Sequence, residues 1–162
     1  MKSRTRYLAG GLMFAAVGVT SIALAQMKPE DAIHARQSIM RTMGISFGPV
    51  AAMAQGKIPF DQKAFVADAL RVEAVWQLNP TGRFFPAGTD KAIPGSKIAE
   101  YTKAKSEIWS EPDKFKKAAE HAGDAIGKLA QAARSGDEGA MKAAAGNVGK
   151  ACKACHDDFH AK

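Results

Sequence analysis

The spacing of the apolar residues constrains the fold of this chain more than any other feature. Between residues 28 and 160 they recur every three or four positions, the repeat of one face of an α-helix, and no stretch shows the alternation of a strand. The pattern forms four segments, at about residues 28–55, 61–78, 110–134 and 137–160. Only the middle connection is long. An all-α, antiparallel four-helix bundle is the simplest architecture that buries four such faces.

Residues at the segment ends match helix-capping chemistry. Asp61 and Asp137 are good N-cap residues for the second and fourth segments. Ser110, with an acid three residues later, has the spacing of a capping box and predicts the start of the third helix. In the first segment, Gly48–Pro49 predicts a kink or an interruption near the end of the helix.

The residues that face inward follow from the same spacing, and the first segment places one arginine among them. The predicted inward residues are Ile33, Arg36, Met40, Met43 and Phe47 in the first segment, and Phe65, Ala69, Val72 and Trp76 in the second.

The long connection at residues 79–97 holds three of the seven prolines and three glycines. Loops of this length in compact domains are usually functional or mobile. Its Phe84–Phe85 pair is too apolar to be left in water, so we expect at least one ring to be packed.

The first 25 residues have the layout of a secretory signal peptide. Three basic residues precede an apolar run at residues 8–24, and the run closes on the small residue Ala25. This run is slightly short for a membrane span of roughly 20 residues. We therefore expect a cleaved signal peptide at residues 1–25 and a four-helix-bundle domain at residues 26–162. We also expect no membrane anchor after cleavage, and export to the periplasm.

The predicted mature chain is mildly basic. The full chain has a formal net charge of +7, and loss of residues 1–25 removes three basic and no acidic residues, which leaves 20 basic and 16 acidic residues, or +4. The lysines are scattered and interleaved with Asp and Glu, unlike the basic stripe of a nucleic-acid-binding surface. We expect no nucleic-acid partner.

Both cysteines of the chain lie in the last segment, where Cys152, Cys155 and His156 share one helical face. Three interpretations fit this arrangement poorly. A disulfide would close a very small loop and stabilise little. A thioredoxin-like redox pair needs a helix N-terminus, whereas this motif is close to a C-terminus. A structural zinc site needs a fourth ligand and usually a second cysteine pair.

The pattern C-x-x-C-H is the attachment signal of c-type haem. Cys152 and Cys155 would add to the haem vinyl groups as thioethers, and His156 would ligate the iron as the proximal axial ligand. We therefore predict one covalently attached haem c with its iron. No methionine follows His156, and the last one is Met141, so any sixth ligand must come from upstream or be absent.

Five stretches cover nearly the whole predicted mature chain: KPEDAIHARQSIM, FGPVAAMAQGKIPFD, FFPAGT, SEIWSEPDKF and VGKACKACHDDF. In this order they resemble the class II cytochromes c, most closely the cytochrome c′ family. The resemblance implies a four-helix bundle with covalently bound haem in its core, assembled as a homodimer. It also implies a five-coordinate iron that binds nitric oxide or carbon monoxide, with its distal face closed by a bulky apolar side chain.

Met40 matches the position of that distal side chain. Bundle geometry reaches the same residue, because the antiparallel first and last helices place the turns around His156 beside the first half of the first helix. Met43 lies about a turn deeper, and His34 is turned away by about 240°. Met40 either ligates the iron as a sixth ligand, as in low-spin members of the class, or packs over it as a flexible apolar residue.

Three further residues are candidate haem contacts. Arg36 lies one turn before Met40, and a buried arginine needs an anionic partner, either a haem propionate or a carboxylate on a neighbouring helix. Gln37 matches a haem-contacting position of the family, and Phe85 is either a haem-edge residue or plain core. One departure from the family is His160, which replaces a basic residue after the motif and is charged only at acid pH.

Two functions of different classes follow. One is a periplasmic monohaem electron carrier that exchanges electrons with redox partner proteins. The other is a module that captures nitric oxide or carbon monoxide at a five-coordinate iron. The resemblance favours a cytochrome c′-like protein with electron-transfer activity and gas binding, and the alternative is a low-spin, Met-ligated carrier without gas binding. No distal acid–base pair is visible beside Met40, so we do not expect an enzyme.

Overall fold

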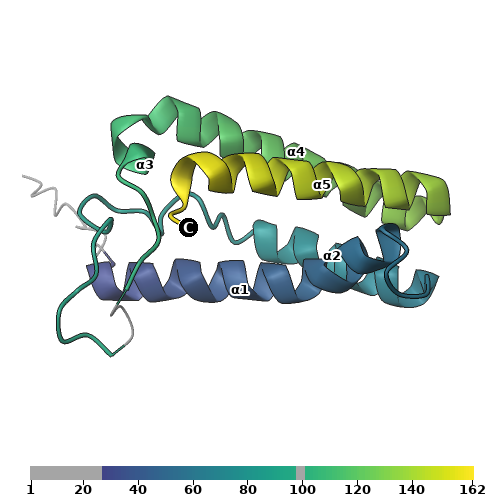
Figure 1. The fold of residues 1–162 in the computed structure, drawn as a ribbon, viewed down its shortest axis with the longest axis horizontal. Helices are drawn as coiled ribbons and strands as arrows, with labels where there is room; N and C mark the ends of the chain where they lie inside the picture. The colour runs from purple at the N-terminus through teal and green to yellow at the C-terminus, as the bar shows by residue number, and fades with distance from the viewer. Residues whose placement is uncertain (1–26, 98–100) are drawn as a thin grey trace, which may run out of the picture.

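Four long helices and one short helix make up the computed structural model, which describes residues 27–97 and 101–162. They are α1 (Pro29–Ala54), α2 (Gln62–Trp76), the one-turn helix α3 (Glu107–Ser110), α4 (Pro112–Ser135) and α5 (Glu138–Phe159). The long helices form a ring in which α1 and α4 each contact both α2 and α5. Figure 1 shows that successive long helices run in opposite directions. The predicted antiparallel four-helix bundle is confirmed, and the predicted signal peptide lies outside the described residues.

Two helix starts are capped as the sequence predicts. The Asp61 side chain accepts a hydrogen bond from the backbone N–H of Ala64 at 2.9 Å, and the Asp137 side chain accepts one from Ala140 at 2.6 Å. Each bond satisfies one of the backbone donors that a helix start leaves without an intrahelical partner. These caps fix where α2 and α5 begin.

The predicted capping box at Ser110 is wrong. Ser110 is the last residue of α3, and the residue that precedes α4 is Glu111, which makes no side-chain cap. The short helix was not predicted, because one turn is too brief to show a helical repeat. Pro112 then starts α4 in the first-turn position that proline favours.

Helix α1 continues through Pro49 to Ala54 without interruption. Proline removes the hydrogen bond to the carbonyl four residues earlier, which is that of Ile45. The helix nevertheless continues for five residues beyond Pro49. Of the predicted kink or interruption, the interruption is therefore absent.

The main hydrophobic core occupies the end of the bundle where α1 leads into α2 and α4 leads into α5. Its largest buried side chains include Phe65, Leu129 and Met141, all with 0% exposure, and small alanines line the contact of α4 with α5. At the other end a second, smaller cluster contains Ile108, Phe115 and Phe159. We call the first end the packed end and the second the open end.

The long connection between α2 and α3 crosses the open end, beside the first turns of α1 (Figure 1). It is pinned to the end of α5 by two backbone hydrogen bonds, from Lys105 N–H to the Phe159 carbonyl at 3.0 Å and from Ala161 N–H to the Lys103 carbonyl at 2.8 Å. None of the helices in the described ranges combines the length and apolarity needed to cross a membrane.

Candidate functional site

A cavity of about 420 Å³ opens between the first half of α1 and the last turns of α5. Its wall on α5 includes Cys155 and His156, and its wall on α1 includes Met40. The connection between α2 and α3 contributes Phe85 and Thr102 to a third side. The volume lies within the range of roughly 300–1,000 Å³ that is usual for cofactor sites.

The cysteine motif lies on one face of α5, as its spacing predicts. Cys155 lines the cavity, whereas Cys152 packs beside it against the main core, and both thiols are free. Burial raises the pKa of Cys155 to about 11 and also raises the pKa of Cys152 above its ordinary value. Both sulfurs are therefore protonated at neutral pH, unlike the reactive thiolate of a redox pair.

A metal site built from side chains alone finds no support in the described ranges. No group of three or more His, Cys, Asp or Glu residues there is placed to hold a metal ion. A thiol pair in a half-buried position, with a histidine on the same face and a cavity in front of it, instead suits a large planar cofactor that is bound covalently.

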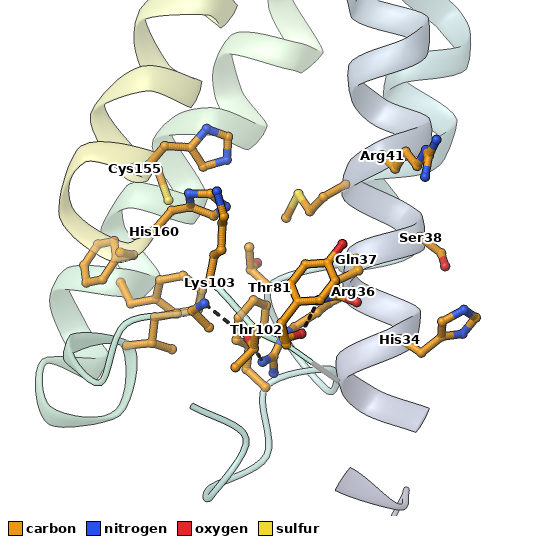
Figure 2. A pocket seen from close by; sticks show the side chains of 18 residues that line it. His34, Arg36, Gln37, Ser38, Arg41, Thr81, Thr102, Lys103, Cys155 and His160 are labelled. Carbon is orange, nitrogen blue, oxygen red and sulfur yellow. Dashed lines mark hydrogen bonds between the residues drawn. The ribbon is translucent and has the colours of Figure 1, made fainter. Parts of the chain in front are cut away.

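Met40 faces this motif from the opposite wall. It lines the cavity and is half-buried, whereas Met43 is buried in the main core. His34 also lines the cavity, but it is exposed, and Figure 2 shows it on the side of α1 that points away from Cys155 and His160. Met40, and not Met43, is thus the methionine of α1 that lies on the cavity wall.

His160 directly follows the end of α5 and lies beside His156, with ring centroids 5.4 Å apart. Burial, followed by the nearby His156 and Lys103, lowers the pKa of His160 below its ordinary value. Its neutral form is therefore favoured at neutral pH. This chain lacks a permanent positive charge at the position where the resemblance implies a basic residue.

Arg36 reaches from α1 into the connection and is only 4% exposed. Its Nη1 donates to the Thr89 hydroxyl at 2.7 Å and to the Phe84 carbonyl at 3.3 Å, and its Nη2 donates to the Thr102 hydroxyl at 2.8 Å and to the Thr89 carbonyl. None of the ion pairs of the described residues includes Arg36. Its contacts are thus neutral oxygens, and the carboxylate partner on a neighbouring helix is absent.

Arg36 keeps its positive charge in this setting. Burial lowers the pKa of its guanidinium to about 10, and the nearby Asp90 opposes that shift. Gln37, the next residue on α1, donates from Nε2 to the Tyr101 carbonyl at 2.8 Å and also lines the cavity. In Figure 2 Arg36 and Gln37 both point from α1 into the site.

Phe85 belongs both to the cavity wall and to an aromatic cluster. Its ring lies 5.2 Å from that of Phe115 and 6.2 Å from that of Trp109, and Trp109 Nε1 donates to the Phe85 carbonyl at 3.1 Å. Phe115 in turn packs edge-on against Phe159 at 5.1 Å. The expected packing of one ring of the Phe84–Phe85 pair is confirmed.

Sequence reasoning missed several residues of this site. Thr89 and Thr102 bind Arg36, and Ile108, Phe115 and Phe159 line the cavity. Phe115 and Phe159 fall on the inward stripes of the third and fourth segments, so helical spacing would have found them. No local pattern marks the two threonines, because their partner lies more than 50 residues away in the chain.

Together these features define a helical-bundle protein with a cofactor cavity facing a C-x-x-C-H motif. The chain belongs to the cytochrome c′ family: the family profile named Cytochrome C' matches residues 31–160. The cytochrome c′ of Rubrivivax gelatinosus is 43% identical over 135 residues, which is 83% of this chain and 98% of that protein. Its crystal structure superposes with a TM-score of 0.73 over the same shares of the two chains.

Two further solved structures are similar. One is a nitric oxide complex of a variant cytochrome c′ from Alcaligenes xylosoxidans, with 36% identity, a TM-score of 0.70, and 83% of this chain and 98% of that one covered. The other is a cytochrome c′ with an unusual ligand-controlled dimer dissociation, with 30% identity, a TM-score of 0.76, and 85% and 100% covered. As a member of this family, the protein is a haem-binding cytochrome with one covalent haem c and its iron.

Proposed function

We propose that this protein is an exported, monohaem electron-transfer cytochrome that also binds nitric oxide or carbon monoxide at a five-coordinate iron. One observation carries the proposal: the face of α5 with Cys155 and His156 opens onto a cavity whose opposite wall is the thioether of Met40. When bound, the haem supplies an iron that cycles between ferric and ferrous states and has two axial positions.

Cys152 and Cys155 would hold the haem, and His156 would be the proximal ligand. An α-helix places residues three and four positions apart on one face, so α5 presents the three groups in fixed relation. The thiols are free and half-buried, and addition of each S–H across a haem vinyl group would join sulfur to one vinyl carbon and hydrogen to the other. The helix therefore fixes the proximal side of the site.

Met40 covers the distal side without ligating the iron. It is half-buried and unbranched, so it can yield space to a small diatomic ligand. Support comes from the similar structure that is a nitric oxide complex. The second candidate is a low-spin carrier in which the Met40 sulfur is the sixth ligand, and the same position on the cavity wall favours it.

Arg36, Gln37 and Phe85 complete the cofactor contacts. Arg36 is buried and charged and has only neutral hydrogen-bond partners, so a haem propionate would add a negative charge to that of the nearby Asp90. Gln37 lines the rim of the cavity beside it, and Phe85 supplies an apolar edge. These residues bind and orient the cofactor; none is placed as an acid–base pair, which supports a carrier rather than an enzyme.

Export and assembly complete the proposal. Residues 1–25 are a signal peptide that is cleaved, and residues 26–162 form the periplasmic domain that meets redox partner proteins. The family match starts only at residue 31, which supports this division. A homodimer is supported by the similar structure described by its dimer dissociation, and by Ile45, an apolar side chain on α1 that is 68% exposed.

Visible absorption spectra test the function directly. The oxidised and reduced protein should show high-spin spectra, and nitric oxide should change both. A low-spin reduced spectrum that nitric oxide leaves unchanged would reject gas binding and establish the Met40-ligated carrier.

Sedimentation of the wild type and of Ile45→Asp tests the dimer, because the charged side chain should produce a monomer.

A further inference from the structure

Arg36 holds together two parts of the chain that are far apart in sequence. From α1 it donates to Phe84 and Thr89 in the first described part of the α2–α3 connection, and to Thr102 in the second. The four hydrogen bonds match the four hydrogens of Nη1 and Nη2. A single guanidinium thus joins three places in the open end of the bundle.

The surroundings of Arg36 also fix the position of its guanidinium. Thr89 is 0% exposed, and its hydroxyl also donates to the Pro86 carbonyl at 2.8 Å. The Arg36 guanidinium lies over the Phe85 ring, 4.7 Å from its centroid, and 6.0 Å from that of Trp109. Hydrogen bonds therefore fix the edge of the guanidinium, and aromatic rings cover its face.

The tied segments form part of the cavity wall. Phe85, which follows the bonded Phe84, lines the cavity. So do Thr102 and the two residues after it, Lys103 and Ala104. Figure 2 shows Thr102 beside Arg36, to which it is hydrogen-bonded. A change in the bonds of Arg36 therefore moves the wall itself.

We propose that Arg36 is a positioning residue that ties both described parts of the α2–α3 connection to α1 and so sets how closely that connection covers the haem. This inference rests on the proposed function, because it takes the cavity as the haem site. Lysine cannot replace Arg36 in this role. Its ammonium is a point charge with three donors on one nitrogen, whereas the bonds here diverge from a planar fork.

The experiment uses the haem-loaded protein and the variants Thr102→Val and Arg36→Lys. Valine keeps the shape of Thr102 but removes the acceptor, and lysine keeps the charge of Arg36 but removes the fork. In Thr102→Val, which also removes the acceptor of the Ala104 N–H at 3.2 Å, loss of the hydrogen bond to the charged Arg36 should raise the exchange of backbone amide hydrogens in residues 84–97 and 101–105 about tenfold. Arg36→Lys loses the fork of four hydrogen bonds and should raise this exchange at least as much. Mass spectrometry of deuterated peptides measures this exchange.

Thr81→Val is the matched control. Thr81 lies in the same connection and lines the same cavity, but it makes none of the hydrogen bonds to Arg36. Its exchange should equal that of the wild type. Equal acceleration in Thr81→Val, or wild-type exchange in Thr102→Val, would overturn the proposal. So would wild-type exchange in Arg36→Lys, because Arg36 would then act only through its charge.

The reduction potential provides a second readout, which a role in folding alone would not move. A looser connection admits water to the haem and favours the more highly charged ferric state, so the potential should fall in Thr102→Val and Arg36→Lys and not in Thr81→Val. Unchanged potentials in both variants would contradict the inference. Failure of the proposed function is seen separately, since wild-type protein without covalent haem would reveal it before any variant is compared.

Discussion

The two ends of the bundle are built differently. At the packed end, four helices meet over fully buried side chains such as Phe65, Leu129 and Met141. At the open end, α1 and α5 are separated by a cavity lined by half-buried, polar and aromatic groups. The packed end has no polar site to position, so it can be filled to crystal-like density. The difference indicates that stability and cofactor geometry are largely supplied by separate parts of one fold.

Small side chains on α4 and α5 support this division between a packed end and an open end. Ala122, Ala125, Ala144 and Ala145 are all buried, and they let α4 approach α5 closely. At the last turn of α5, Phe159 packs against Phe115 of α4, with ring centroids 5.1 Å apart, while Cys155 and His156 line the cavity. Contact with α4 thus positions the end of α5 beside the cavity.

The largest effect is expected at the open end, from His156→Ala. Loss of the proposed proximal ligand should change the visible spectrum of the oxidised and reduced protein, while circular dichroism should still show a helical bundle. His160→Ala is the matched control, since it removes a neighbouring imidazole ring that lies 5.4 Å from that of His156. An unchanged spectrum in His156→Ala, with a changed one in His160→Ala, would reverse the assignment of the ligand.

At the packed end, Phe65→Ala should lower the free energy of unfolding by about 3–5 kcal/mol, because it leaves a cavity in the core. Denaturant unfolding followed by circular dichroism measures this loss. Phe60→Ala removes the neighbouring ring, 5.4 Å away but only half-buried, and should cost less. The visible spectrum of folded Phe65→Ala should match the wild type, and an altered spectrum would show that the two ends are not separable.

A smaller effect is expected from the cap of α5. Asp137→Ala removes the acceptor for the Ala140 N–H and should lower the free energy of unfolding by about 1 kcal/mol. Asp137→Asn can form the same cap and should stay close to the wild type. Equal losses in the two variants would mean that the charge of Asp137, rather than the cap, stabilises α5.

Only a small effect is expected from Met40→Leu. Methionine and leucine have similar volumes, so the free energy of unfolding should change by less than about 1.5 kcal/mol. If Met40 only covers the iron, the spectra of both oxidation states should stay the same. A change from a low-spin to a high-spin spectrum would instead show that the Met40 sulfur is a ligand, and would favour the alternative carrier.

The packed end could be predicted from sequence almost completely, and the open end only in part. Helical spacing placed Phe65, Ala69 and Val72 in the core, because residues on one helix face share one environment. The same rule put Met40 and the cysteine motif on facing walls. These are properties of regular helices, so they can be read from local patterns.

The connection at the open end has no such pattern. The bonds of Arg36 to Thr89 and Thr102 span 53 and 66 positions, and the pairing of residues 103–105 with 159–161 also joins distant segments. Sequence reasoning recognised that a buried arginine needs partners but did not find these neutral ones. Long-range contacts of an irregular segment depend on the assembled fold. The one-turn helix α3 was missed because a single turn is too short to show a helical repeat.

Covalent attachment of haem to α5 is the central claim, and the mass of the denatured protein tests it most directly. The full chain should be expressed in a bacterial host that matures c-type cytochromes, purified, and unfolded before mass spectrometry. We predict the mass of a chain that begins at Gln26 and carries one haem, and the mass of the bare chain for a Cys152→Ser, Cys155→Ser double variant. A wild-type protein that unfolds to the bare polypeptide mass would contradict the account.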